Sequence, residues 1–168
     1  MKSSLVNQMI QEHSQGAFAM AMNMLKCRDD AQDVIQDALY SLLKQPRLPS
    51  ESNQFRMLLF KVVRNKVIDR IRAKKKRKAE VLEEEHSPSC GHHEPDNQYE
   101  QALMKTQLQQ ALTALSAEHR DIILLKDWQG FCYADIANIL GIEPGTVMSR
   151  LHRARLALRN LLQQGDDK

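Results

Sequence analysis

The segment YADIANILGIEPGTVMSRLHRARLALRNLL, residues 133–162, decides the fold of the C-terminal part of this 168-residue chain. Its first eight residues carry a helical apolar pattern that stops at Gly141, and Pro144 follows three residues later. Glycine is favoured just after a helix, and proline in the first turn of the next one. The segment therefore predicts a helix over 133–140, a tight turn and a second helix over 145–162, which together make a helix-turn-helix.

The second helix of this segment has two contrasting faces when its residues are placed at 100° steps. The apolar face, expected to pack on the first helix, consists of Val147, Leu151, Ala154 and Leu158. The opposite face consists of Met148, Ser149, His152, Arg153, Leu156 and Arg159, with Arg150 and Arg155 at its flanks. Arginine pairs with guanine, and serine and histidine hydrogen-bond base edges or phosphates, so this face suits the major groove of DNA. An ordinary solvated face is the alternative.

Upstream of the helix-turn-helix, residues 79–98 lack helical periodicity and are rich in proline, serine and acidic residues. Such a composition is typical of a flexible linker. The chain is therefore predicted to consist of an N-terminal domain over residues 1–78, an acidic flexible linker over 79–98 and a C-terminal domain over 99–168.

The remainder of both domains also predicts helices. Asp29 and Asp30 offer an N-cap for a helix whose apolar positions recur every three or four residues through 31–43. Pro46 and Pro49 interrupt the chain before a long helix that can begin within residues 50–53. Further helices are predicted over residues 17–25, 100–115 and 117–127. Aromatic residues at 5% and only 6 glycines agree with an all-α fold of two small helical domains joined by a flexible linker.

The formal net charge of +3 conceals a strong segregation of charge along the chain. Residues 61–78 contain ten basic side chains and one acidic one, whereas residues 80–100 contain seven acidic side chains and no lysine or arginine. A further basic block lies in residues 149–160. Two basic surfaces separated by an acidic spacer indicate that a polyanion is bound at two places.

Several motifs, in one order along the chain, carry a family resemblance. DAQDVIQDAL (30–39) and FRMLLFKVVRNKVIDR (55–70) resemble region 2 of bacterial sigma factors, and residues 111–115, 133–137 and 145–155 resemble region 4. Two domains with nothing like regions 1 or 3 are similar to the small extracytoplasmic-function (ECF) group. The resemblance implies a non-catalytic subunit, without a cofactor, that binds core RNA polymerase and directs initiation at specific promoters.

The resemblance also implies where the polymerase binds. The polar face of the helix over 30–43 corresponds to the surface that docks on the clamp helices of the polymerase largest subunit; here it carries Asp33, Gln36 and Asp37. These side chains are suitable partners for arginine. Region 4 would contact the flap of the second-largest subunit. A membrane-bound anti-sigma factor is a further partner expected from the resemblance.

Region 2 would read and open the promoter minus-ten element, which requires a cationic track and a pocket for an unstacked base. The residues expected to bind this element are Lys61, Arg64, Asn65, Lys66, Arg70 and Arg72. Among them Asn65 matches a base-contacting asparagine of the family, and the loop over 45–54 corresponds to the segment that shapes the base pocket. The lysine-rich run over 74–78 would add non-specific phosphate attraction.

Region 4 would read the minus-thirty-five element as duplex DNA. The expected base contacts are Ser149, His152 and Arg153, while Arg150 and Arg155 would hold phosphates or stay solvated. Three positions depart from the family pattern. Leu58 replaces a usual Trp, Met148 replaces a Lys or Arg common in the recognition helix, and Cys132 replaces a common Ser N-cap, which predicts a weaker cap.

Three other interpretations use the same sequence. The set His86, Cys90, His92 and His93 could bind zinc or copper, although its spacing matches no structural zinc pattern, and a plain polar linker is the simpler reading. An enzyme is disfavoured because no nucleophile, base and orienting group form a recognisable arrangement. A stand-alone helix-turn-helix regulator would leave the N-terminal basic helix unexplained. Without an apolar signal region or spanning stretch, and with three widely spaced cysteines, the protein is expected to be cytoplasmic and free of disulfides.

Overall fold

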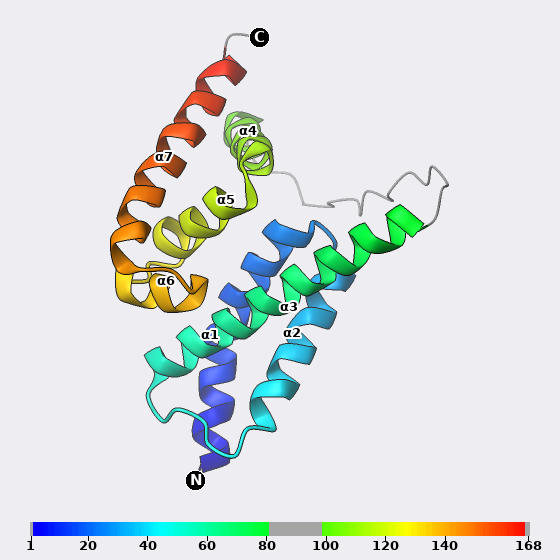
Figure 1. Cartoon of the computed structure of the whole chain (residues 1–168), viewed down its shortest axis with the longest axis vertical. Helices are drawn as coiled ribbons and strands as arrows, with labels where there is room; N and C mark the ends of the chain where they lie inside the picture. The colour runs from blue at the N-terminus through cyan, green and yellow to red at the C-terminus, as the bar shows by residue number, and fades with distance from the viewer. Residues whose placement is uncertain (1, 81–98, 167–168) are drawn as a thin grey trace. The chain divides into compact units, whose positions relative to one another are not determined.

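The computed structural model describes residues 2–80 and 99–166. The chain divides into two compact units, residues 1–91 and 92–168, called here unit 1 and unit 2. Within the described ranges every regular element is a helix, which confirms the predicted all-α fold (Figure 1). The predicted linker over 79–98 lies almost entirely outside the described residues.

Unit 1 is a three-helix unit made of α1 (Lys2–Leu25), α2 (Arg28–Leu43) and α3 (Ser52–Glu80). Each helix contacts the other two, and Figure 1 shows them packed along one another. α1 begins well before the predicted residue 17, and α3 continues two residues past the predicted domain end at 78. The core is formed by Met20, Val34, Ala38, Leu42, Phe55, Leu59, Phe60 and Val63, which are all buried.

The junction between α1 and α2 corrects one sequence expectation. Lys26 takes a left-handed conformation with φ 55°, which ends α1, and Cys27 occupies the N-cap position of α2 without a side-chain hydrogen bond. Asp29 and Asp30 therefore do not cap α2 but lie inside its first turn. Acidic side chains are favourable there because they face the positive end of the helix dipole.

Unit 2 is built around α7 (Pro144–Asp166), which contacts all three other α-helices of the unit. These are α4 (Tyr99–Ala114), α5 (Ala117–Ile123) and α6 (Tyr133–Leu140). The predicted helix over 117–127 is present, but its second half is the short π-helical segment η1 (Leu124–Trp128). The core of unit 2 contains Leu112, Ile122, Leu125, Ile136, Ile139, Val147, Leu151 and Ala154.

The helix-turn-helix over α6 and α7 forms as predicted. Gly141 has φ 67°, a left-handed conformation that glycine adopts without steric cost, and it turns the chain at the end of α6. The Ile142 N–H donates to the Ala137 carbonyl at 3.0 Å, which closes the turn. Cys132 does act as N-cap of α6, since its Sγ accepts from the Asp135 N–H at 3.5 Å, although a thiol is a weak acceptor.

The termini of α4 and α5 are joined through one partly buried guanidinium. Arg120 Nε donates to the Leu112 carbonyl at 2.7 Å, and its Nη2 donates to the carbonyls of Thr113 and Leu115, both at 2.9 Å. The last carbonyls of a helix have no partner within the helix. Arg120 thus provides hydrogen-bond donors for the carbonyls at the C-terminal end of α4 and fixes this end to α5.

Among the residues that the structure describes, no helix has the length and hydropathy needed to span a bilayer.

Candidate nucleic-acid and protein interfaces

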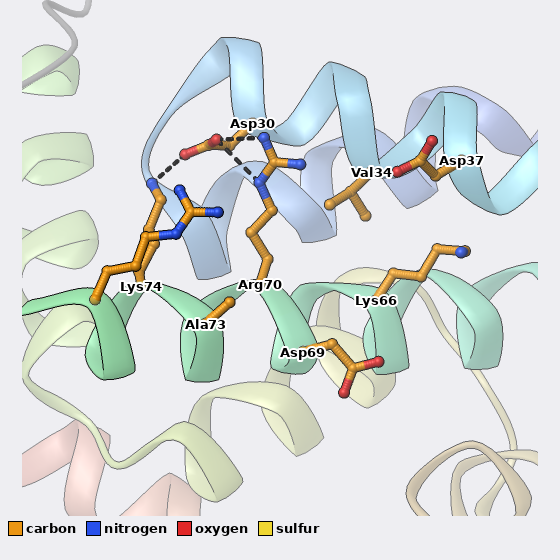
Figure 2. A pocket seen from close by; sticks show the side chains of 9 residues that line it. Asp30, Val34, Asp37, Lys66, Asp69, Arg70, Ala73 and Lys74 are labelled. Atoms are coloured by element: carbon orange, nitrogen blue, oxygen red, sulfur yellow. Dashed lines mark hydrogen bonds and ion pairs between the residues drawn. The ribbon is translucent and has the colours of Figure 1, made fainter. Parts of the chain in front are cut away.

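An ion cluster joins the first turn of α2 to the second half of α3. Arg70 donates to Asp30 Oδ1 from Nε at 3.1 Å and from Nη2 at 2.8 Å, and its Nη2 also lies 3.0 Å from Asp33 Oδ2. Lys74 Nζ donates to the second oxygen of Asp30. Figure 2 shows Arg70 and Lys74 reaching from α3 toward Asp30. The cluster therefore holds two helices together by charge-assisted hydrogen bonds.

The electrostatics of the cluster follow from these contacts. The hydrogen bond from Lys74, and then that from Arg70, lowers the pKa of Asp30 below its ordinary value of 3.8, against the opposing effect of burial. The hydrogen bond to Asp30 raises the pKa of Arg70. Asp30 is the better shielded carboxylate, with 13% of its side chain exposed against 59% for Asp33. Asp30 is thus the anchor of the cluster.

Replacing Asp30 is expected to loosen unit 1. Asp30→Ala should lower its free energy of unfolding by about 2 kcal/mol, because Arg70 loses a paired acceptor while partly shielded from water. Because the folded pKa lies below the unfolded one, this stabilisation is present above pH 3.8 and is lost as the pH falls through the lowered value. Urea unfolding followed by far-ultraviolet circular dichroism should show the difference at pH 7 and its decrease in acid.

Asp29→Ala is the matched control for this experiment, since Asp29 is an exposed carboxylate in the same turn of α2. It removes the same charge near the helix N-terminus but leaves the cluster intact. Fluorescence of Trp128, the chain's single tryptophan, reports on unit 2 and should not change in either variant. Equal destabilisation by both changes would show that the helix dipole, and not the cluster, is responsible.

A groove of about 490 Å³ lies between α2 and α3 beside the ion cluster. Its lining comes from both helices: Asp30, Val34, Asp37, Lys66, Asp69, Arg70, Ala73, Lys74 and Arg77. Figure 2 shows Lys66 on the same side of α3 as Arg70 and Lys74. Two of the residues predicted to bind DNA, Lys66 and Arg70, therefore face this groove and α2.

Other predicted DNA-binding residues lie on the side of α3 away from its core contacts. Lys61, Asn65 and Arg72 are spaced four and seven residues apart, which places them on one side of a helix. Asn65 and Arg72 are exposed and Lys61 is half-exposed, while Val63 and Val67 on the other side are buried. Arg64 is half-exposed beside them. The basic run over 74–78 follows in an exposed stretch of α3, with Lys74 and Arg77 lining the groove beside α2.

The start of α3 is tied to α1. Ser52 Oγ donates to Glu12 Oε2 at 3.2 Å and is hydrogen-bonded to His13 Nε2 at 2.6 Å. Burial, the largest effect, lowers the pKa of His13. α3 begins at Ser52, within the predicted range of residues 50–53, so the last three residues of the segment over 45–54 belong to the helix. The end of this segment is thereby held against α1 by side-chain hydrogen bonds.

The outer face of α2 exposes the three residues predicted to bind polymerase, Asp33, Gln36 and Asp37. Asp33 forms an ion pair with Arg70, whereas Asp37 forms no ion pair with another residue that the structure describes. Tyr40 continues this face one turn later with 62% exposure, and Lys44 Nζ lies 4.2 Å above its ring. Leu43, the last apolar position of the pattern predicted through residues 31–43, is also exposed.

The outward face of α7 presents the predicted base-contacting residues. Ser149, His152 and Arg153 are all exposed, whereas Val147 and Leu151 are buried against the rest of unit 2. Ser149 Oγ donates to the Thr146 carbonyl at 3.2 Å, and Arg153 Nε donates to the Ser149 carbonyl at 3.3 Å. Both side chains thus rest along their own helix.

The two flanking arginines of α7 have carboxylate partners within unit 2. Arg150 Nη1 lies 3.5 Å from Glu118 Oε2 on α5, and Arg155 donates from Nε to Asp127 Oδ2 at 3.0 Å and from Nη2 to Asp127 Oδ1. The hydrogen bond to Asp127 raises the pKa of Arg155. Sequence reasoning did not find Glu118 and Asp127, because partners about 30 residues apart leave no local signal.

The candidate metal ligands His86, Cys90, His92 and His93 lie outside the described residues. Within residues 2–80 and 99–166, no group of three or more His, Cys, Asp or Glu side chains could hold a metal ion.

Comparison with known proteins identifies both units. The family model for sigma-70 region 2 matches residues 9–77, and that for sigma-70 region 4 matches residues 105–158. The ECF RNA polymerase sigma factor SigL of Mycobacterium tuberculosis is 34% identical over 97% of this chain and 92% of its own length. SigM of the same organism is 30% identical over 93% of this chain and 76% of its own length.

Solved structures agree in fold. The sigma factor RpoE of Bartonella quintana, solved in complex with the anti-sigma factor NepR, superposes with a TM-score of 0.70 at 26% identity, covering 94% of this chain and 96% of that one. CnrH, solved with the cytosolic domain of CnrY, gives a TM-score of 0.67 at 21% identity over 98% and 90% of the two chains. The expected resemblance is confirmed: the chain belongs to the sigma-70 family as an ECF sigma factor, a non-catalytic subunit that binds core RNA polymerase and directs promoter-specific transcription initiation.

Proposed function

We propose that three separate surfaces of this sigma factor bind polymerase and the two promoter elements. The outer face of α2 docks on the clamp helices of the polymerase largest subunit through Asp33, Gln36 and Asp37. The outer side of α3 binds the minus-ten element, and the outward face of α7 reads the minus-thirty-five element. The observation that carries this proposal is that α2 exposes an acidic face, whereas α3 and α7 each expose a basic one.

The α3 surface suits separated DNA strands. Lys61, Arg64 and Arg72 supply a cationic track for the phosphates, and the exposed amide of Asn65 can hydrogen-bond an unstacked base. Lys66 and Arg70 face the groove beside α2, so they act on DNA at its edge while Arg70 also maintains the contact of α3 with α2. This arrangement keeps the DNA-binding helix firmly seated on the polymerase-binding one.

The α7 surface suits duplex DNA. Ser149, His152 and Arg153 project from the first half of the helix, which is the part that enters the major groove in helix-turn-helix proteins. Arg150 and Arg155, which pair with Glu118 and Asp127 in the free chain, would bind phosphates at the groove edge. Unit 2 also contacts the flap of the second-largest polymerase subunit.

An anti-sigma factor is a further proposed partner. RpoE, which shares the fold of this chain, was solved in complex with the anti-sigma factor NepR. Promoter DNA and core polymerase both reside in the cytoplasm, so we propose that this protein is cytoplasmic.

Run-off transcription tests the function directly. Purified core polymerase with the full chain should initiate at a subset of genomic promoter fragments that core polymerase alone does not use. Tight, sequence-specific duplex binding by the free protein, with no transcription when core polymerase is added, would instead favour a stand-alone regulator.

Substitutions on the two DNA surfaces should have different effects. Arg153→Ala should relax recognition at one upstream position by about tenfold, since one side chain that pairs with a base contributes roughly 1–3 kcal/mol of discrimination. Asn65→Ala should leave the upstream preference unchanged but slow promoter opening. Promoter libraries and permanganate footprinting measure the two effects.

Arg159→Ala removes an exposed arginine farther along α7 and is the control for Arg153→Ala. It should weaken all promoters equally. Identical responses of Arg153→Ala and Arg159→Ala would contradict direct readout.

A further inference from the structure

Met148 is an unusual residue on the outward face of α7. Its side chain is 59% exposed, although the neighbouring Val147 is fully buried. It stands beside Ser149 in the second turn of the helix and one turn before His152, which are both exposed. A large apolar side chain thus lies within a face that is mainly polar and basic, and Leu156, 50% exposed two turns later, is the other apolar residue of that face.

We propose that Met148 reads the C5-methyl group of a thymine in the upstream promoter element. The inference deepens the proposed function of α7 and rests on it. It assigns this position a base preference that neither a lysine nor an arginine would give.

The chemistry of the side chain leaves few other contacts in DNA. A thioether has no hydrogen-bond donor and is a weak acceptor, so Met148 cannot pair with guanine or adenine edges and cannot hold a phosphate. Among the major-groove edges of the base pairs, the methyl group of thymine is the apolar feature. Methionine is also unbranched and flexible, which lets it follow a methyl group whose position shifts slightly between promoters.

The geometry of α7 allows Met148 to approach the bases. The first turn presents Pro144 and Gly145, and a Cβ placed on Gly145 would meet no atom within 4 Å. The two exposed residues of that turn, Pro144 and Gly145, are therefore small. The flanking guanidiniums of Arg150 and Arg155 are directed to Glu118 and Asp127 of the same unit.

Charge complementarity identifies DNA as the occupant of this face. Arg153 and Arg159 are both exposed on α7, and acidic residues are lacking throughout residues 144–164 of this helix. A polyanion is attracted to such a surface, whereas an apolar protein partner would leave its arginines desolvated and unpaired. Met148 then supplies an apolar contact to a base, which electrostatic attraction to the phosphates does not provide.

The test replaces thymine by uracil, which removes one methyl group and keeps every base-pairing edge. Each thymine of the upstream element of a promoter obtained by run-off transcription is replaced in turn, and the affinity of the complete holoenzyme is measured. Wild-type holoenzyme should lose about fourfold in affinity at one position, as expected for one apolar carbon group returned to water. Met148→Ala should show no loss at that position and keep its response elsewhere.

Met104→Ala is the matched control, because Met104 is 72% exposed on α4 and lies outside the α7 face. It should respond to uracil as the wild type does. Alanine favours helix at both exposed positions, so both variants are expected to fold.

The outcomes separate this inference from the proposed function. A holoenzyme that binds the unmodified promoter but ignores every uracil, or a Met148→Ala variant that keeps the wild-type response, overturns the role of Met148 alone. An upstream element in which no position favours thymine overturns it equally. Failure of the wild-type chain to direct transcription from any promoter overturns the proposed function together with this inference.

Discussion

Arg120→Ala is expected to lower the free energy of unfolding of unit 2 by about 3 kcal/mol, the largest loss of stability expected from a single polar side chain in that unit. Arg120 donates to the carbonyls of Leu112, Thr113 and Leu115 at distances of 2.7–2.9 Å. Hydrogen bonds from a charged donor are stronger than neutral ones. Their loss leaves three carbonyls at the end of α4 without the partner that also fixes this helix to α5.

The same substitution should reach the DNA-binding face indirectly. α7 contacts both α4 and α5, so loosening the α4–α5 junction removes part of the support of α7. Burial lowers the pKa of Arg120, and the nearby charge of Asp121 partly opposes this effect. We therefore expect Arg120→Ala to lose recognition of the upstream element at temperatures at which the wild type retains it.

Trp128 fluorescence during urea unfolding of the full chain measures this loss, because the single tryptophan lies in unit 2. Arg120→Lys should recover only part of the stability, since an ammonium group lacks the planar fork that reaches three carbonyls. Arg159→Ala provides a second comparison, as it removes an exposed arginine from α7. If Arg120→Ala unfolded at the same urea concentration as Arg159→Ala, the carbonyl contacts would contribute nothing to stability.

The sequence predicts best where the structural signal is local. The bounds of α6 were predicted correctly, because a left-handed glycine at 141 and a proline at 144 act within a few residues. The end of the helix predicted over residues 117–127 was harder to predict. There the Gln129 N–H donates to the Leu124 carbonyl and the Phe131 N–H to the Leu125 carbonyl, which widens the last turns.

Leu43 shows the limit of apolar periodicity. It is the last of the apolar positions that recur through residues 31–43, yet a step of 100° per residue places it about 120° around the helix from Ala31. Leu42 lies close to the direction of Ala31 and is buried, while Leu43 is 54% exposed. The apolar stripe is therefore narrower than the run of apolar residues in the sequence.

The ion pairs of the candidate surfaces are not predictable from local sequence. Asp30 and Arg70 are 40 residues apart, and Asp127 and Arg155 are 28 residues apart. Motif resemblance located Arg70 and Arg155 as basic residues of DNA-binding helices but gave no partner for either. The packing of α2 on α3, and of unit 2 around α7, decides which arginines have carboxylate partners within the chain.

Asp37→Lys is expected to weaken binding of the full chain to core polymerase by about 30-fold, or about 2 kcal/mol, because it places a cation where the proposed partner surface is basic. Asp37 is a cleaner choice than Asp33, whose carboxylate lies 3.0 Å from Arg70 and so contributes to the fold of unit 1. Asp37 is exposed, and it lines the groove into which Lys66 also projects. Reversal of its charge thus also brings two cations close together.

Asp37→Asn separates these two effects, since it removes the attraction without adding a cation beside Lys66. It should weaken binding about fivefold and leave unfolding of unit 1 unchanged. Glu12→Lys makes the same charge reversal on α1, at a side chain with 56% exposure. It also removes the acceptor of the Ser52 hydroxyl, so its urea unfolding is measured alongside, and it should bind core polymerase almost as the wild type does. Equal losses in Asp37→Lys and Glu12→Lys would mean that overall charge governs binding. A loss confined to the substitutions at Asp37 would locate the docking surface on α2. Added salt should also weaken binding of the wild type to core polymerase, because screening acts on the same attraction that the substitution removes.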